Sequence, residues 1–346
     1  LVYNPGLSLL ELVSVESAKR LNLFVKNISE QVRKEIKNPK LRSILEFPVL
    51  FLGAKPNKTP AFYNFMNHAD FGLGTWYPKG GFNAVALGMV KLAKELGVEF
   101  HVNEEVIGID YENNQAKKIR TQNGVYEADV FISGADYAHT EKLLNGNRNY
   151  SEEYWQKKTF APSSFLYYVA FNRKVNHLLH HNLFFDTDFE AHAKEIYDTK
   201  ELPKQPLFYA NFSSKTDDSL CEEGKEVGFF LIPVAVDLED NEEIHEKYFQ
   251  LILDRIKKCT GEDLSDAIVF KKSFGVKDFK ERYHSCRGNA YGLANTLLQT
   301  SVLRPTIKNK KLKNFFYTGQ LTVPGPGVPP ALISGKVVTD YILKNN

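Results

Sequence analysis

The C-terminal part of this sequence joins an apolar strand, a turn rich in proline and glycine, and an amphipathic helix. The run 315–317 (FFY) predicts the end of a buried strand, Gly319 interrupts it, and the turn spans 324–327 (PGPG). Two prolines follow at 329–330, where a helix start accepts proline because the first helical N–H groups have no partner inside the helix. Apolar residues then recur at helical spacing over 333–342.

A strand, a glycine-rich turn and a helix in this order favour a ligand-binding loop. Glycine allows a ligand to approach the main chain closely, and the N–H groups of a helix start attract electron-rich groups. A flavin or a phosphate fits such a loop. An ordinary tight connection between a strand and a helix explains the pattern equally well, so the pattern alone leaves both interpretations open.

Three segments resemble one family of enzymes. Residues 319–338 (GQLTVPGPGVPPALISGKVV) resemble the C-terminal flavin-contacting signature of the phytoene-type carotenoid desaturases, FAD enzymes of the amine-oxidase-like group. Residues 76–81 (WYPKGG) resemble the aromatic-Pro-basic-Gly-Gly motif of that family. Residues 291–293 (YGL), with the LLQTS that follows them, are similar to the segment before the last FAD strand. The three matches occur in the order of the family and span most of the chain.

The resemblance implies a mixed α/β (α+β) fold of the amine-oxidase-like type with two domains. One is a Rossmann-type FAD domain that is incomplete here, and the other is a substrate domain built on a mostly antiparallel sheet with helices. We expect residues 1–75 and 146–290 to form the two parts of the substrate domain, the first of them facing a membrane. Residues 76–145 would return to the FAD domain, and residues 291–346 would complete it.

The same resemblance implies FAD as the cofactor and suggests which residues contact it. Residues expected to line the isoalloxazine ring are Gly319, Gln320, Gly327, Val328 and Pro329, and those expected near the dinucleotide are Val106, Gly134 and Ala135. An ordinary core-strand valine is an equally good interpretation of Val106. Gln320 stands where related sequences often carry a small or acidic residue.

The G-x-G-x-x-G turn that binds the ADP half of FAD is missing from the sequence. Gly72-Leu-Gly74 has no third glycine and leads into 76–78 (WYP), which cannot begin a helix, while 325–327 (GPG) lies at the other end of the chain. The chain also begins at Leu1 without a methionine. We therefore expect a fragment that lacks the N-terminal nucleotide-binding portion and does not retain FAD tightly by itself.

Composition excludes several other classes of protein. The 346 residues allow two domains, and the net charge of +2 argues against a nucleic-acid partner. Three dispersed cysteines argue against a disulfide framework and a zinc site, and favour a reducing compartment. The longest apolar stretches, 47–54 and 227–236, are far shorter than the ~20 residues of a spanning helix and predict buried strands.

The partners are expected to be a carotenoid or another long apolar polyene and a membrane surface. The 25 Phe and 17 Tyr fit an aromatic-lined tunnel for such a ligand, although a Phe-rich core explains them too. We expect a cytoplasmic protein held peripherally at the inner face of the membrane, of undetermined oligomeric state. The basic run 308–313 either contacts anionic headgroups or forms a solvated turn, and the second interpretation is favoured.

Periodicity predicts the remaining elements. Residues 1–70 are expected to be mostly helical, with apolar faces that include Leu9, Leu12, Val13 and, further on, Leu21, Phe24, Val25 and Ile28. A helix is predicted over 82–96 and another over 244–256, and 183–206 is expected to be a polar loop with one short helix. Predicted strands cover 98–102, 106–111, 117–121, 125–132, 164–171, 207–212, 227–236 and 268–274.

No catalytic residue can be assigned from the sequence. His177, His180 and His181 have no carboxylate or cysteine at ligand spacing, so no metal is expected. His68 and Asp70 fit proton removal less well than a surface helix end. Desaturation by hydride transfer to FAD requires that the protein position the substrate and exclude water from it. A strong side-chain base is not obligatory, because a polyene delocalises the positive charge that hydride removal leaves behind. A redox-neutral carotenoid isomerase, a retinol-saturase-like reductase and a non-catalytic lipid-binding fragment remain as alternatives.

Overall fold

The structure is a computed structural model that describes residues 2–12, 23, 26–48 and 53–345. Close contacts divide the chain into two compact units, each built from separate stretches of sequence. Unit 1 comprises Leu1–His68, His101–Pro162 and Lys280–Asn346, and unit 2 comprises Ala69–Phe100 and Ser163–Phe279. The division into substrate and FAD segments predicted from the sequence concerns which ligand each segment holds, and it stays a prediction.

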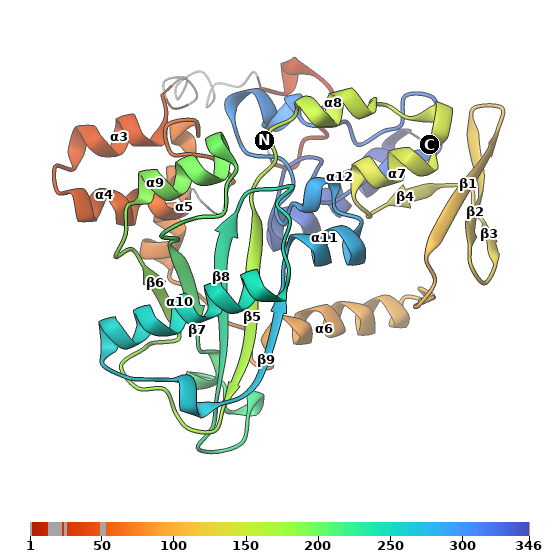
Figure 1. The fold of residues 1–346 in the computed structure, drawn as a ribbon. Coiled ribbons are helices and arrows are strands. Elements are labelled where there is room, and N and C mark those ends of the chain that lie inside the picture. The colour runs from red at the N-terminus through yellow and green to blue at the C-terminus, as the bar shows by residue number, and fades with distance from the viewer. Residues whose placement is uncertain (1, 13–22, 24–25, 49–52, 346) are drawn as a thin grey trace. The chain divides into compact units, whose positions relative to one another are not determined.

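The described residues form both helices and strands, so the predicted mixed fold class is confirmed at this level (Figure 1). The α-helices are α3 (Ile28–Glu35), α4 (Pro39–Glu46), α5 (Phe65–Asn67), α6 (Gly81–Glu95), α7 (Tyr137–Leu143), α8 (Glu152–Lys157), α9 (Phe189–Lys194), α10 (Glu242–Thr260), α11 (Val276–Tyr283) and α12 (Val328–Asn345). None of the described helices is both long and apolar enough to cross a lipid bilayer.

The strands form separate sheets. They are β1 (Val106–Glu112), β2 (Gln115–Thr121), β3 (Val125–Glu127), β4 (Phe131–Ser133), β5 (Ser163–Phe171), β6 (His181–Phe184), β7 (Phe208–Asn211), β8 (Glu226–Val234), β9 (Ile268–Phe274) and β10 (Phe315–Tyr317). Strands β1, β2 and β3 form an antiparallel sheet, and β10 pairs in parallel with β4. The largest sheet has the order β6-β7-β8-β5-β9 and is antiparallel throughout.

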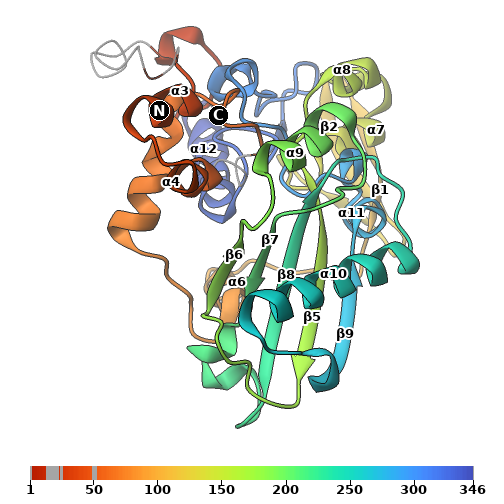
Figure 2. The ribbon, with the colours of Figure 1, turned by 60° about the vertical axis from the view of Figure 1, so that its left-hand side comes forward.

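Unit 2 is organised around this five-stranded sheet, and α10 covers one of its faces (Figure 2). Burial alternates strictly along β8, because successive side chains of a strand point to opposite faces. Phe230 and Ile232 are fully buried on the covered face and pack with Phe249 and Ile252 of the helix. The predicted antiparallel sheet and its long helix are therefore present, while their assignment to a substrate domain stays a prediction.

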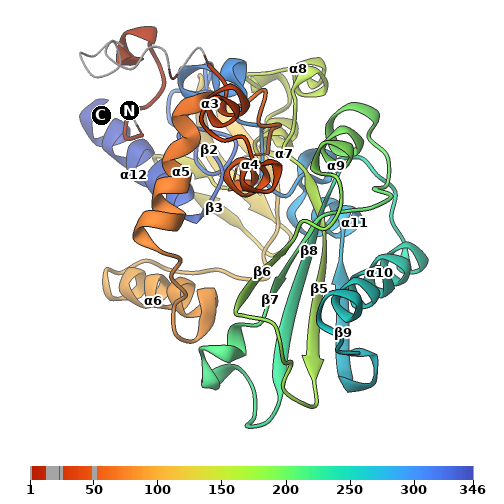
Figure 3. The same ribbon diagram turned by 90° about the vertical axis from the view of Figure 1, so that its left-hand side faces the viewer.

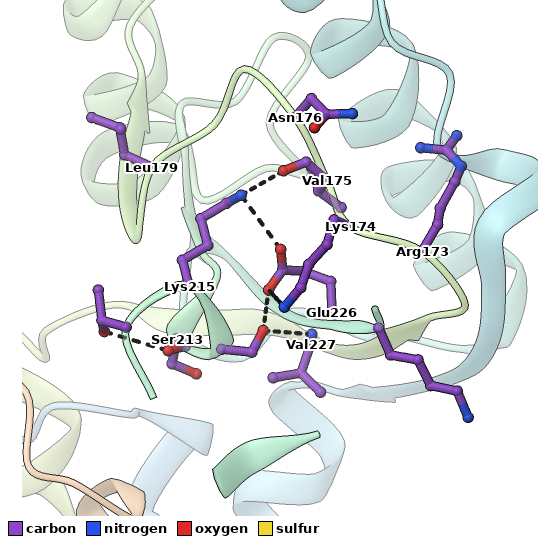
Figure 4. A network of polar contacts seen from close by, with 12 residues as sticks. Arg173, Lys174, Val175, Asn176, Leu179, Ser213, Lys215, Glu226 and Val227 are labelled. Carbon is purple, nitrogen blue, oxygen red and sulfur yellow. Dashed lines mark hydrogen bonds and ion pairs between the residues drawn. The ribbon is translucent and has the colours of Figure 1, made fainter. Parts of the chain in front are cut away.

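A fully buried carboxylate lies at the start of β8. Glu226 accepts a hydrogen bond from the hydroxyl of Ser214 and forms ion pairs with Lys215 (Nζ to Oε2, 3.4 Å) and Lys174 (Nζ to Oε1, 3.9 Å) (Figure 4). Lys215 also donates to the carbonyl of Val175 at 2.5 Å. The network keeps a charge in the protein interior by surrounding it with donors.

Replacing Lys215 by methionine should lower the free energy of unfolding of unit 2 by about 3 kcal/mol, because Glu226 then loses its main counter-charge inside the protein. Lys225→Met is the matched control, since Lys225 pairs with Glu222 and both side chains are exposed. Urea unfolding followed by circular dichroism compares the two variants. Equal stabilities for both would show that the Glu226 network contributes little.

The neutral imidazole of His192 makes unit 2 sensitive to acid. Its Nδ1 accepts from the Leu207 N–H at 3.0 Å, its Nε2 lies 2.9 Å from the Pro233 carbonyl, and burial lowers the pKa of His192 to about 4. Because the folded pKa lies below the ordinary value, this stability is present above pH ~6.5 and is lost as pH falls towards 4, by about 3 kcal/mol. Urea unfolding at several pH values should show the loss for the wild type and a smaller one for His192→Gln. Identical pH profiles would contradict this.

Unit 1 contains a small cluster of N-terminal helices and a two-stranded parallel sheet. Helices α3 and α4 lie side by side, and Ile28 and Val32 of α3 form a core with Tyr63 of the short helical turn Ala61–Asn64 that precedes α5 (Figure 3). Helix α12 packs on β10 through a cluster that includes Phe316 and Val338. Hydrogen bonds of Ser334 with Thr318 and Gly319 bring the second turn of α12 to the end of β10.

Some sequence predictions were wrong in detail. Residues 98–102 alternate like a strand, but within the described chain they pair with no neighbour, and Val98, Phe100 and Val102 are exposed. The predicted strand 125–132 is two strands, β3 and β4, that belong to different sheets. The polar stretch 183–206 contributes the end of β6 as well as α9. The predictions on Val13, Leu21, Phe24 and Val25 lie outside the described residues. Of the predicted strand 47–54, residues 49–52 also lie outside them, while 47–48 form a helical turn and 53–54 a bend instead of a strand.

Candidate functional site

The candidate site begins where two parallel strands end together. Strand β10 pairs with β4 up to Tyr317 and Ser133, and the Thr318 N–H donates to the Ser133 carbonyl at 2.9 Å. Gly134 and Gly319 follow directly. Gly319 has a φ of +100°, and a Cβ built on it would lie 3.8 Å from the Gly134 carbonyl oxygen. The two glycines thus leave a side-chain-free surface at the carboxyl end of the sheet.

A serine of α12 fixes this strand end against the helix. Ser334 is fully buried, and its hydroxyl accepts a hydrogen bond from the Gly319 N–H at 2.8 Å. It also lies 2.6 Å from the Thr318 hydroxyl and donates to the Ala331 carbonyl at 2.7 Å. The position of Gly319 is therefore set by the helix as well as by the sheet.

The number of free backbone N–H groups at the start of α12 indicates whether a phosphate or a flat ring fits there better. Gly327, Val328 and Pro329 are exposed at this helix start, and Gly327 has a φ of +113°. Proline at 329 and at 330 carries no N–H, so this helix start offers few of the amide donors that hold a phosphate. The dipole of α12 still makes its start favourable for an electron-rich group. The loop thus suits an electron-rich ring edge better than a phosphate group.

The other side of the turn rests on a buried arginine and on the predicted 291–293 segment. Gly292 packs against Gln320, because a Cβ on Gly292 would lie 3.0 Å from the Gln320 carbonyl oxygen. Arg304 donates to the carbonyls of Gln320 (3.2 Å) and Leu293 (3.3 Å). Two of the three segments that carried the family resemblance therefore meet at this turn.

Seven of the eight predicted cofactor residues lie on this strand-end and turn structure. Ala135 follows Gly134 and is exposed, and Gln320 is half-buried. Val106 is the exception, because it begins β1 in a different sheet, where its partner is Thr121. The flavin roles of these residues stay predictions.

Unit 2 carries a second candidate surface on the sheet face that α10 does not cover. We call it the open sheet face; the large apolar side chains that strand register places on it include Leu166, Tyr168, Leu183, Tyr209, Phe229, Leu231 and Phe270. Register also places Lys272 on this face, opposite Tyr168. Tyr209, Phe229 and Tyr168 form an aromatic row across three strands, with ring centroids 6.4 and 5.3 Å apart. Tyr168 is 44% and Phe270 55% exposed. This apolar, partly exposed face suits a long apolar ligand.

One end of the open sheet face carries a pair of neutral hydrogen-bonding side chains. Nδ1 of His181 lies 2.5 Å from the hydroxyl of Tyr209, and Asn211 donates to the same hydroxyl at 2.9 Å. Burial lowers the pKa of His181 and raises the pKa of Tyr209, so both are neutral at physiological pH. These groups can hydrogen-bond to a ligand without adding charge to the apolar face.

The WYPKGG segment is anchored within unit 2. The N–H of Gly80 donates to the carboxylate of Asp217 at 2.6 Å, and the hydrogen bonds from Ser219 and Gly80 lower the pKa of Asp217. Trp76 is 84% exposed. Asp70 accepts from the hydroxyl of Thr75 at 2.7 Å, and nothing in its contacts assigns it a catalytic role. In the part of the chain that the structure describes, no cluster of three metal-ligating side chains occurs.

Sequence reasoning missed several residues that shape these surfaces. Arg304 could not be recognised from the sequence, because a single arginine before a proline is part of no known binding or catalytic motif. Ser334 was visible only as one of the small residues of the predicted helix. The aromatic row could not be found before the register of β7, β8 and β5 was known.

Comparison with known proteins adds further findings. Residues 9–343 match the family described as flavin containing amine oxidoreductase. The chain is 40% identical over 325 residues to a carotenoid 3,4-desaturase of Haloarcula japonica (93% of this chain, 66% of the relative). It is 31% identical over 322 residues to a zeta-carotene-forming phytoene desaturase of Myxococcus xanthus (90% and 61%). The chain thus spans less than two thirds of the length of these curated relatives.

Among solved structures, an oxidoreductase from Methanosarcina mazei matches with a TM-score of 0.61 and 17% identity, over 96% of this chain and 74% of that one.

Proposed function

The chain belongs to the family of flavin-containing amine oxidoreductases, and we propose that it provides the substrate surface and one side of the flavin site of an FAD-dependent carotenoid desaturase. The predicted amine-oxidase-like fold class is confirmed by the family match and the structural similarity. The names of both relatives concern carotenoids, which supports the substrate class. The observation that carries the flavin assignment is the meeting of Gly134 and Gly319 at one strand end beside α12.

The residues of the turn fit a flavin. Gly134 and Gly319 would let a flavin ring approach the main chain, and the dipole at the start of α12 would favour an electron-rich group there. Ser334 holds Gly319 in place. When bound, FAD supplies a two-electron hydride acceptor, which is what removal of two hydrogens from a polyene requires.

The open sheet face is proposed to position the polyene and keep water away from it. Phe229 and Tyr168 offer flat apolar contacts along the row, and the His181–Tyr209 pair provides a neutral polar end. Transfer of a polyene from a bilayer to such a face exchanges one apolar environment for another, so the gain in hydrophobic free energy is small. Selectivity then depends on the shape of the face and on its polar end.

An anaerobic titration tests the proposed activity. Flavin-loaded protein is mixed with liposomes that contain phytoene, a later carotene or a hydroxylated carotenoid, and the flavin absorbance and the product mass are recorded. We expect bleaching of the flavin and a product that is two hydrogens lighter than the substrate. A product of unchanged mass would indicate an isomerase, and one heavier by two hydrogens a reductase. A flavin that no carotenoid reduces would refute the desaturase proposal.

We also propose that the protein associates peripherally with a membrane, at its cytoplasmic face. The support is a group of exposed apolar side chains in unit 2, Phe71 (58%), Leu73 (64%) and Trp76 (84%). Tryptophan favours the interface between headgroups and acyl chains. Trp76→Ala should reduce binding to carotenoid-free vesicles severalfold in a flotation assay, while Lys225→Met leaves it unchanged. Equal flotation of both variants and the wild type would argue against a membrane role for this group.

A further inference from the structure

Arg304 is a buried cation in direct contact with the glycine-rich turn. Only 4% of its surface is exposed. Besides the carbonyls of Gln320 and Leu293, its guanidinium donates to the side-chain oxygen of Asn295. Gly325, with a φ of +135°, packs on the guanidinium, because a Cβ there would lie 3.1 Å from Nη2. The arginine thus ties the turn to two neighbouring segments.

Every observed acceptor of Arg304 is neutral. Within the described ranges, no carboxylate pairs with Arg304, and its Nε–H has no hydrogen-bond partner. Burial lowers the pKa of Arg304 to about 10, so the group stays charged at neutral pH. A buried charge without a counter-charge is costly, and a neutral amide side chain would satisfy two carbonyls at lower cost. Hydrogen bonding to the turn alone therefore does not explain why a charged side chain is buried at this position.

We propose that Arg304 is a positioning residue that shapes the glycine-rich turn and, through its charge, raises the reduction potential of the flavin held there. The inference rests on the proposed function. Reduction adds negative charge to the ring, and a cation next to the turn favours that charge in a medium of low dielectric constant. The neutral acceptors found for Arg304 among the described residues fit this role, because a carboxylate counter-charge would cancel the effect.

Two substitutions separate the shape of the turn from the charge. Arg304→Lys keeps the charge but loses the planar fork that reaches several acceptors, whereas Arg304→Met removes both. A purely structural role predicts similar behaviour of the two variants. An electrostatic role predicts that lysine largely preserves the potential. Arg120→Met is the control, because Arg120 forms an exposed ion pair with Asp110 on the β1–β2 hairpin.

The experiment measures the midpoint potential of the flavin-loaded proteins by dye equilibration, together with amide hydrogen exchange of residues 319–327. We expect Arg304→Met to lose about tenfold of its preference for reduced over oxidised flavin, a fall of about 30 mV for a two-electron couple. Arg304→Lys should lose much less, and Arg120→Met nothing. Exchange in the turn should accelerate in both Arg304 variants. If Arg304→Met does not fold, Arg304→Gln replaces it with the same expectations.

The outcomes are distinct. An unchanged potential in flavin-loaded Arg304→Met overturns the inference and leaves the proposed function standing. Equal falls in Arg304→Lys and Arg304→Met overturn the electrostatic role. Because this chain alone is not expected to retain FAD tightly, the proteins compared are complete ones, as long as the curated relatives; a complete wild-type protein that binds no flavin overturns the proposed function and the inference together.

Discussion

Replacing Gly319 by valine is expected to weaken flavin binding by about 100-fold, or about 3 kcal/mol. Gly319 has a φ of +100°, a conformation that side-chain-bearing residues rarely adopt. A valine there would also extend over the surface that Gly134 and Gly319 leave free at the strand end. Isothermal titration of the complete protein with FAD measures the loss.

A matched glycine separates the backbone effect from the site. Gly97 has a φ of +85°, and a Cβ built on it would meet no atom within 4 Å. Gly97→Val therefore introduces similar backbone strain without filling the proposed site, and it should bind flavin like the wild type. Normal flavin binding by Gly319→Val, or an equal loss in Gly97→Val, would contradict the assignment of the turn.

Placing a carboxylate at Phe229 should lower kcat/KM for the polyene about 100-fold, equivalent to about 3 kcal/mol of transition-state stabilisation. Phe229 is the middle ring of the aromatic row, between Tyr209 and Tyr168. An aspartate there would have to lose its hydration shell against an apolar ligand, which is unfavourable. Steady-state turnover of carotenoid in liposomes measures the effect, while the flavin content is expected to stay unchanged.

Two further variants control for the possibility that Phe229→Asp loses activity because it does not fold. Phe229→Leu keeps an apolar side chain and should retain most of the activity. Val269→Asp places a charge on β9 of the same sheet, at a position that is 61% exposed, and should be nearly silent. A Phe229→Asp protein with normal turnover would show that the open sheet face does not contact the substrate. Thermal unfolding confirms that each variant is folded.

The sequence predicted best what depends on local chemistry. The strand, turn and helix over 315–342 were predicted correctly, because proline, glycine and helical spacing act within a few residues of one another. The apolar run 227–236 likewise predicted a buried strand, and the structure has β8 there. That one of its faces is more deeply buried than the other became visible only in the structure. The glycines Gly134 and Gly319, 185 positions apart, were both singled out by the family resemblance rather than by any local rule.

Features that depend on distant partners could not be predicted. Residues 98–102 have the alternation of a strand, but strand formation needs a hydrogen-bonded neighbour, which no local pattern supplies. The run 125–132 was assigned to one strand because its composition does not show that β3 and β4 join different sheets. Arg304 became visible only when the fold brought Leu293 and Gln320 to its guanidinium.

Hydrogen–deuterium exchange with and without FAD tests the central claim most directly. If the turn between β10 and α12 holds the flavin, peptides covering 318–328 and 131–136 should exchange more slowly when FAD is bound. Helix α10, on the covered face of the sheet in unit 2, should exchange at the same rate in both states. Bound FAD that leaves both peptides unprotected would contradict the account.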